Sequence, residues 1–328
     1  MANIAPTVAV ASQRENAAGR GIPRTPSGKP GARRRRTLTA YLFLAPFLIL
    51  FIGFIVAPAI FGLWMSLTDW SPFRDVQHFV GLQNYIDLFT AGSATFGDFW
   101  QSMSATGIFV VGSVPFLIVV PMFVAILLNQ KIRAAAAFRT VFFAPYVLGV
   151  AVIGVIWKYI FDTQSGILNH LLTLVGLPGD VPWTVDVPWA WVSLIGVTVW
   201  WTMGLNTIIM LAGLKGINGD LYEAAALDGA GAFRKFTSVT LPGLRPVMTF
   251  VTTTTILASA NMFGQAYLLT KGGPGHSTRT AIMYIAEQGL SQNNMAPAAA
   301  MSYVLFACLS IISIINFRLQ RERGENGR

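Results

Sequence analysis

The chain contains few of the residues that make or break covalent bonds. Its one cysteine, Cys308, lies in an apolar stretch, so a single chain forms neither a disulfide nor a cysteine-based metal site. Its three histidines are far apart in sequence and fit no zinc-binding spacing. The only Gly-Lys pair, Gly28-Lys29, precedes Pro30 rather than the Ser or Thr of a phosphate-binding loop. We therefore expect no catalytic residue, no cofactor and no metal.

Polar residues inside apolar stretches are the remaining candidates, and their chemistry would be binding. Thr254, Ala258, Asn261 and Gln265 are spaced i, i+4, i+7 and i+11, which places them on one face of a helix. An amide in hydrocarbon needs a hydrogen-bond partner, so this face must point into protein or water. We expect Asn261 and Gln265 to line a central cavity.

Trp201 and Asn206 lie in an earlier apolar stretch and have side chains that suit a sugar. A sugar ring has apolar faces and a rim of hydroxyl groups, which match an indole ring and an amide. We expect both residues on the same substrate path. Hydrogen bonds between amides on neighbouring helices also stabilise bundles without any ligand, and this alternative stays open for Asn206, Asn261 and Gln265.

The elements that must position these residues are membrane-spanning helices. Of 328 residues, 54% are hydrophobic and 11% charged, whereas a soluble domain has about a quarter charged. Six stretches without Asp, Glu, Lys or Arg are each long enough to cross about 30 Å of hydrocarbon. They lie between Arg36 and Asp69, Asp98 and Lys131, Arg139 and Lys158, Asp186 and Lys215, Arg245 and Lys271, and Glu287 and Arg318.

These stretches predict an all-α integral membrane protein with six transmembrane helices over residues 37–317. The third stretch is the shortest and is expected to be the least tilted. Prolines inside or at the ends of the spans indicate bent helices in a bundle, because neighbouring helices satisfy the carbonyls that a proline frees. Residues 1–36 have no apolar periodicity and predict a disordered basic cytoplasmic tail, and residues 318–328 a cytoplasmic C-terminal tail.

The positions of the basic residues predict the orientation. Of 23 Lys and Arg residues, 19 fall in the first tail, the 131–139 loop, the 214–246 loop and the last tail. The other four are Arg74, Lys158, Lys271 and Arg279. The positive-inside rule then places both termini in the cytoplasm. The basic run at 33–36 has no interleaved aromatic residue, so it indicates membrane topology and no nucleic-acid partner.

Two short helices are predicted in the outer loops. Apolar residues recur at helical spacing within residues 80–90 and again within residues 165–176. Both segments are expected to lie on the membrane surface.

The segment 220–242, DLYEAAALDGAGAFRKFTSVTLP, predicts a helical hairpin. Asp220 lies three residues before Glu223, as in a capping box, and a helix is expected from Leu221 to Asp228. Gly229 is expected to end it with a positive φ. A second helix is predicted over 232–239, stopped at Leu241-Pro242 because the residue before a proline avoids the α region.

The same segment resembles the "EAA" loop of permease subunits of binding-protein-dependent ABC importers. That pattern reads Glu-Ala-Ala, three residues, Gly, nine residues, an Ile-like residue, any residue and Leu-Pro. Here it falls on Glu223-Ala224-Ala225, Gly229, Val239 and Leu241-Pro242, with Val where Ile is usual. Gly-Leu-Gln-Asn-Tyr at 81–85 and Leu-Thr-Lys-Gly-Gly-Pro at 269–274 resemble further elements of carbohydrate-class permeases, and Asn-Phe-Arg at 316–318 closes the last span.

The resemblance implies a permease subunit of a type I ABC importer in a bacterial-type cell membrane, surrounded by lipid. It implies a sugar or polyol substrate, an extracytoplasmic solute-binding protein, a second homologous permease subunit and a dimer of cytoplasmic ATPase subunits. The residues that would contact the ATPase are Glu223, Ala224, Ala225, Asp228, Gly229, Leu241 and Pro242. A stand-alone secondary transporter or channel for a small polar solute is the alternative, although no paired ionisable residues occur within the six stretches.

Overall fold

The computed structural model describes residues 30–73, 76–130 and 135–325, which form two compact units, 1–60 and 61–328. These residues are mostly helical and contain no strand beyond one isolated bridge between Thr68 and Phe79. The predicted all-α class is confirmed. Residues 1–29, where most of the tail was predicted, lie outside the described part of the chain.

The described part of the first unit is a single run of helix. α1 (Pro30–Phe51) continues through the π-helical turn η2 (Ile52–Val56) into α2 (Ala57–Ser66), which begins in this unit. The tail prediction is therefore wrong for residues 30–36, whose Ala and Arg residues are good helix formers. Apolar side chains such as Phe43 and Phe54 are exposed. A helix that is apolar all round is typical of a lipid environment.

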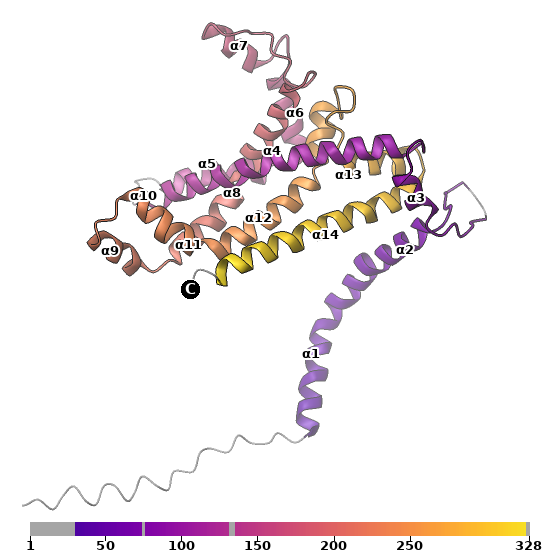
Figure 1. Ribbon diagram of the computed structural model, residues 1–328, viewed down its shortest axis with the longest axis horizontal. Coiled ribbons are helices and arrows are strands. Elements are labelled where there is room, and N and C mark those ends of the chain that lie inside the picture. Colours follow the sequence, from indigo (N-terminus) through magenta and orange to yellow (C-terminus); the bar gives the residue numbers. More distant parts are fainter. Residues whose placement is uncertain (1–29, 74–75, 131–134, 326–328) are drawn as a thin grey trace, which may run out of the picture. The chain divides into compact units, whose positions relative to one another are not determined.

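The second unit is built on four helices that pack side by side (Figure 1). They are α4 (Phe96–Asn129), α8 (Trp189–Lys215), α12 (Arg245–Ala260) and α14 (Met295–Glu325). α4 contacts both α8 and α12, and α12 also contacts α14. The core between α4, α8 and α12 is aliphatic and includes Val124, Leu128, Met210, Leu214 and Val251. α14 extends to Glu325, so helical backbone continues into the predicted C-terminal tail, whose cytoplasmic location stays a prediction.

Glycines on α8 allow its neighbours to approach closely. A Cβ on Gly213 would lie 2.7 Å from Cγ2 of Val247 on α12. A Cβ on Gly204 would overlap the carbonyl oxygen of Phe142 on α5 (Ala135–Val147). Since real Cβ atoms do not come this close, α8 needs a hydrogen atom at both positions.

The third apolar stretch is bent, as its proline predicted, and it does not form the straight helix that the least tilted span would need. α5 and α6 (Val150–Ile160) meet at an angle of 98°. Pro145 provides no N–H to its helix, and Gly149 has an extended backbone at φ −66° and ψ 149°. These two residues explain why the helix ends at Val147 and restarts in a new direction.

The six-span count stays a prediction. Four helices in the described residues are long and apolar enough to cross a membrane: Tyr41–Ser66, Phe96–Asn129, Trp189–Lys215 and Met295–Arg318. The bent α5–α6 pair would be a fifth if it forms one span. In the remaining stretch α12 has only 16 residues, and the π-helical turn η4 (Ala266–Thr270) follows after a break.

Both predicted outer-loop helices are confirmed as α3 (Gln83–Phe89) and α7 (Ile167–Leu174). Asn84 ties α3 to the end of α2, because its Nδ2 donates to the carbonyls of Ser66 and Thr68 at 2.9 Å each. The Tyr85 hydroxyl shares a 2.6 Å hydrogen bond with Ser66 Oγ. The Asn-Tyr pair of the 81–85 element therefore fixes this corner of the fold.

The predicted helical hairpin is present at one end of the bundle, with α3 and α13 (Ala281–Ala286) at the other (Figure 1). It consists of α9 (Gly219–Leu227), α10 (Ala232–Lys235), the π-helical turn η3 (Phe236–Thr240) and α11 (Leu241–Gly243). Pro242 does not stop the second helix as predicted. Helical backbone continues to Gly243 because η3 widens the turn, with the Leu241 N–H bonding to the carbonyl of Phe236.

Candidate functional site

A cavity of about 440 Å³ lies among α4, α8, α12 and the α5–α6 bend. All four predicted path residues line it, and so do Thr254 and Ala258 of the predicted polar face. The path residues are Trp201, Asn206, Asn261 and Gln265. Two aromatic side chains, Tyr146 and Phe263, complete a wall that combines rings with amides. The structure thus brings together residues that are up to 64 positions apart in sequence.

Asn206 has a structural partner at this cavity. Its Nδ2 donates to the carbonyl of Leu117 on α4 at 3.0 Å and lies 3.3 Å from Thr255 Oγ1 on α12. Leu117 is four residues before Pro121, which has no N–H to offer it. Asn206 therefore replaces the missing helical donor, as in the interhelical role that the sequence left open.

Trp201 supports the bend beside the cavity. Its Nε1 donates to the carbonyl of Leu148 at 3.1 Å, and Leu148 lies between the end of α5 and the start of α6. The indole ring is half-buried and faces the cavity from α8.

Asn261 and Gln265 are separated by a break in the helix that was expected to carry both. Asn261 ends α12, and its Nδ2 donates to the carbonyl of Leu257 at 2.8 Å. The continuous face predicted for residues 254–265 is therefore interrupted after Ala260, although both amides still reach the cavity. In the described part of the chain, no hydrogen bond is found for the side chain of Gln265, which leaves its amide available to a ligand.

The first helix of the hairpin begins earlier than predicted. Asn218, not Asp220, is the N-cap of α9, and its Oδ1 accepts a 3.0 Å hydrogen bond from the Asp220 N–H. The predicted capping box from Asp220 to Glu223 is wrong because Asn218 already has the extended backbone of a cap, at φ −61° and ψ 127°. Asp220 then lies in the first turn, where its charge is favourable.

Gly229 ends α9 in the way that the sequence predicted, with φ +74°. The N–H of Ala230 donates to the carbonyl of Ala225 at 2.9 Å, and the N–H of Gly229 donates to that of Ala226 at 3.1 Å. This pair of bonds is a Schellman motif. A 2.9 Å hydrogen bond between the hydroxyls of Tyr222 and Thr240 fastens α9 to η3, so the hairpin is a defined element rather than a loose connection.

The hairpin presents apolar side chains that the described part of the chain leaves exposed. None of the α9 residues is buried, and Leu227 and Phe233 are 91% and 80% exposed. Among the predicted coupling residues Glu223, Ala224, Asp228, Gly229 and Leu241 are exposed, while Ala225 and Pro242 are half-buried. Contiguous exposed apolar side chains on a rigid element mark a surface for another protein.

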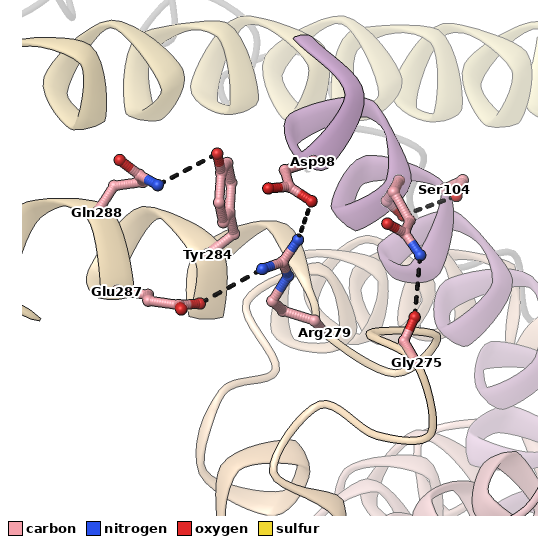
Figure 2. A network of polar contacts seen from close by, with 8 residues as sticks. Asp98, Ser104, Gly275, Arg279, Tyr284, Glu287 and Gln288 are labelled. Atoms are coloured by element: carbon pink, nitrogen blue, oxygen red, sulfur yellow. Dashed lines mark hydrogen bonds and ion pairs between the residues drawn. The ribbon is translucent and has the colours of Figure 1, made fainter. Parts of the chain in front are cut away.

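A buried arginine that the sequence analysis counted only as an outer charge organises the opposite end of the bundle (Figure 2). Arg279 is 4% exposed, and its Nη2 lies 2.6 Å from Asp98 Oδ1 in the first turn of α4. Its Nη1 lies 3.6 Å from Glu287 Oε2 of the π-helical turn η5 (Glu287–Ser291), and its guanidinium lies 4.6 Å from the ring centre of Tyr284. Arg279 was missed because its partner Asp98 is 181 residues away.

Threonine hydroxyls support the loop that carries Arg279. Thr270 and Thr278 share a 2.7 Å hydrogen bond, and Thr278 also donates to the carbonyl of Gly273 at 2.7 Å. Thr280 Oγ1 donates to the carbonyl of Met262, and Thr106 Oγ1 of α4 accepts from the N–H of Ala281 at 2.8 Å. The Leu-Thr-Lys-Gly-Gly-Pro element is thus anchored by buried polar groups at both of its ends.

Comparisons with known proteins agree with this architecture. Residues 88–323 match the family described as "Binding-protein-dependent transport system inner membrane component". The probable ABC transporter permease protein YesP of Bacillus subtilis is 32% identical over 87% of this chain and 91% of its own length. The lactose transport system permease protein LacF of Rhizobium radiobacter is 31% identical over 90% of this chain and 99% of its own length.

A solved structure has the same fold. It is the bacterial alginate ABC transporter in complex with an alginate pentasaccharide-bound periplasmic protein, and one of its chains superimposes with a TM-score of 0.77 at 21% identity. The match covers 88% of this chain and 96% of that one.

Proposed function

Because this chain belongs to the family of inner-membrane components of binding-protein-dependent transport systems, we propose that it forms part of the path by which an ATP-driven importer carries a carbohydrate across the cell membrane. An extracytoplasmic binding protein delivers the solute, and a second, homologous permease subunit completes the path. ATP is hydrolysed by separate cytoplasmic ATPase subunits, so this chain itself is not an enzyme. Lipid surrounds the apolar helices.

The observation that carries the carbohydrate assignment is the 440 Å³ cavity. Its volume is within the range of small-molecule sites, and it combines the indole of Trp201 with the amides of Asn261 and Gln265. The relatives named for their substrates support the same class, since LacF is a lactose permease and others are named for arabino-oligosaccharides and trehalose or maltose.

Uptake of labelled carbohydrates by a strain that lacks the gene tests this assignment. The strain carries the wild-type chain, Asn261→Leu, Gln265→Leu or the control Gln83→Leu, which removes an exposed amide on α3 outside the cavity. We expect the two cavity variants to lower uptake while the protein still assembles, and Gln83→Leu to transport normally. Normal uptake by both cavity variants would mean that these amides serve only packing.

The hairpin of α9 and α10 transmits the movement of the ATPase subunits to the bundle. Hydrogen bonds close both ends of α9, and a further one joins α9 to η3, so the hairpin is rigid. Its exposed Leu227 and Phe233 suit a short helix that docks in a groove of a partner. Glu223, Ala224 and Ala225 lie on α9, and Gly229 sets the turn after it.

Docking is tested by co-purification of the ATPase subunits together with uptake. Ala225→Trp fills the surface of α9 with a bulky ring, and Leu227→Ala removes the exposed apolar side chain. We expect both to insert in the membrane and to lose either the ATPase or the coupling of hydrolysis to uptake. Leu174→Ala is the control, since this leucine is 69% exposed on α7 instead. Wild-type association and uptake in both hairpin variants would make the hairpin a plain connector.

The distribution of Lys and Arg supports an orientation with both termini and the hairpin in the cytoplasm. Single cysteines in a Cys308→Ser background test it by labelling with a membrane-impermeant reagent. Ser93 is half-buried and bonds to the Asp87 carbonyl, so the exposed Ala91 is the better outer position. A cysteine there reacts in intact cells, and one at the exposed Ser238 reacts only after the membrane is opened. Labelling at 238 in intact cells contradicts the orientation.

A further inference from the structure

A second cavity, of about 680 Å³, lies between α6 and the segment 263–291. Nothing in the transport path described above uses it. The polar side chains that line it are mainly basic, and it also holds an exposed aromatic ring. These side chains are Lys158, Tyr267, Lys271, His276, Arg279, Glu287 and Ser291.

Two glycine contacts form one wall of this cavity by bringing α6 against η4. A Cβ on Gly154 would lie 2.6 Å from Cβ of Leu268, and a Cβ on Gly264 would lie 2.6 Å from Cγ2 of Val150. Lys158 is one helical turn beyond Gly154, and its side chain lines the same cavity as that glycine. The close approach of the two backbones thus places Lys158 on the same cavity wall as the end of η4, where Lys271 lies.

The backbone holds Lys271 in a fixed place. Lys271 ends η4 in the left-handed region at φ +51°, which is uncommon for a residue with a side chain. The turn after it is closed by the Gly273 N–H, which donates to the Thr270 carbonyl at 2.9 Å. A residue held in strained backbone by buried partners is typical of a functional site.

Among the residues that the structure describes, no carboxylate lies within ion-pair distance of either lysine. Arg279 is shared between Asp98 and Glu287, so its charge is compensated (Figure 2). For Lys158 and Lys271, in contrast, no ion pair is found among the residues that the structure describes. Both side chains are exposed, so an ammonium group from each is free to meet an anion in the cavity.

An aromatic pair lines this cavity, and one of its two rings also lines the central cavity. The rings of Phe263 and Tyr267 are stacked, with their centres 5.4 Å apart and their planes inclined by 12°. Phe263 lines both cavities, while Tyr267 lines the basic one and is 53% exposed. The apolar face of a sugar ring packs well on such an exposed aromatic face.

We propose that this cavity is an outer subsite for an anionic carbohydrate, in which Lys158 and Lys271 hold the acidic groups and Tyr267 packs against a sugar ring. The inference rests on the proposed function, because it assigns the charge class of the solute. Lysine is a compact point charge that accepts carboxylate or phosphate, so the shared requirement is a negative group on a sugar.

Binding to the full-length chain in lipid nanodiscs tests the subsite, with titration calorimetry as the readout. The probes are trigalacturonate and its methyl ester, which have the same sugar rings but differ in charge. Because both lysines are exposed, their two ion pairs predict that the acid binds about 2- to 30-fold more tightly than the ester. In Lys158→Gln/Lys271→Gln we expect this preference to disappear while the affinity for the ester is unchanged. Lys215→Gln, at the end of α8, is the matched control and keeps the preference.

Three results would overturn the subsite. One is equal affinity of the wild type for acid and ester, or no saturable binding of the acid. Another is displacement of trigalacturonate by an equal concentration of inorganic phosphate, which would indicate an anion site without a sugar contact. The third is an unchanged preference in the double variant, combined with reduced uptake of neutral sugars, since the lysines would then dock a protein. Uptake of neutral sugars remains the separate test of the proposed function.

Discussion

Gly229 offers the sharpest test of how the α9 hairpin is held. Its φ is +74°, and a Cβ added there would meet nothing within 4 Å. Gly229→Ala therefore introduces backbone strain and no clash. The left-handed conformation destabilises a residue with a side chain by about 1–2 kcal/mol. Alanine also lowers the conformational entropy of the unfolded chain, which stabilises the folded state by roughly 0.4–1 kcal/mol. The net cost of roughly 1 kcal/mol raises the open fraction of this helix end about fivefold.

Hydrogen exchange of the membrane-embedded protein measures this opening. The amides of Gly229 and Ala230 close the Schellman motif, so their protection should fall by this factor in Gly229→Ala. Gly229→Asn should lose less of this protection than Gly229→Ala, because Asn tolerates the left-handed region. Gly219→Ala is the control on the same helix, since a Cβ there also meets nothing, and it should keep or raise protection. Equal protection in Gly229→Ala and Gly219→Ala would refute the strain argument.

Three further substitutions probe the bundle, each measured as the thermal midpoint of the purified protein. Gly204→Ala pushes a methyl group into the backbone of α5 and should cost about 1–3 kcal/mol, whereas Gly196→Ala on the same helix meets nothing within 4 Å and should be tolerated. Asn206→Leu leaves a carbonyl of α4 without its donor, which should cost about 1–3 kcal/mol. Arg279→Met should also lower the stability by about 1–3 kcal/mol. The cost is smaller than for a fully buried ion pair, because the carboxylates of Asp98 and Glu287 are 46% and 40% exposed. Arg279→Lys should restore only part of the lost stability, because lysine lacks the planar fork of donors. Unchanged midpoints for Gly204→Ala, Asn206→Leu and Arg279→Met would contradict the contacts assigned to these three residues.

The parts of this fold that depend on nearby residues were predictable from sequence. The positive φ of Gly229 follows from its place after a helix of good formers. The cavity position of Asn261 and Gln265 follows from the need of amides in hydrocarbon for a polar environment. The N-cap was misplaced by two residues because Asn218 and Asp220 are both good caps, and only the backbone distinguishes them.

The parts that depend on distant partners were not predictable. Pro145 predicted a bent helix, but the angle and direction of the bend between α5 and α6 were not predictable, because they depend on the helices that pack against it. Arg279 was counted as a loop charge, since its pairing with Asp98 depends on how α4 packs against α13. Charged residues near the ends of apolar stretches are therefore candidates for pairing across the bundle.

The bond from Asn206 to Leu117 also has a consequence for how the chain is made. α4 leaves the ribosome with a carbonyl whose helical donor is replaced by Pro121, and the amide that satisfies it follows 89 residues later. At ordinary rates of synthesis this gap lasts roughly 5–20 s. An unsatisfied carbonyl in hydrocarbon costs several kcal/mol, so newly made α4 is disfavoured as a lone helix in lipid. Insertion of α4 is thereby coupled to the arrival of α8, and the two helices enter the bilayer most favourably as a pair.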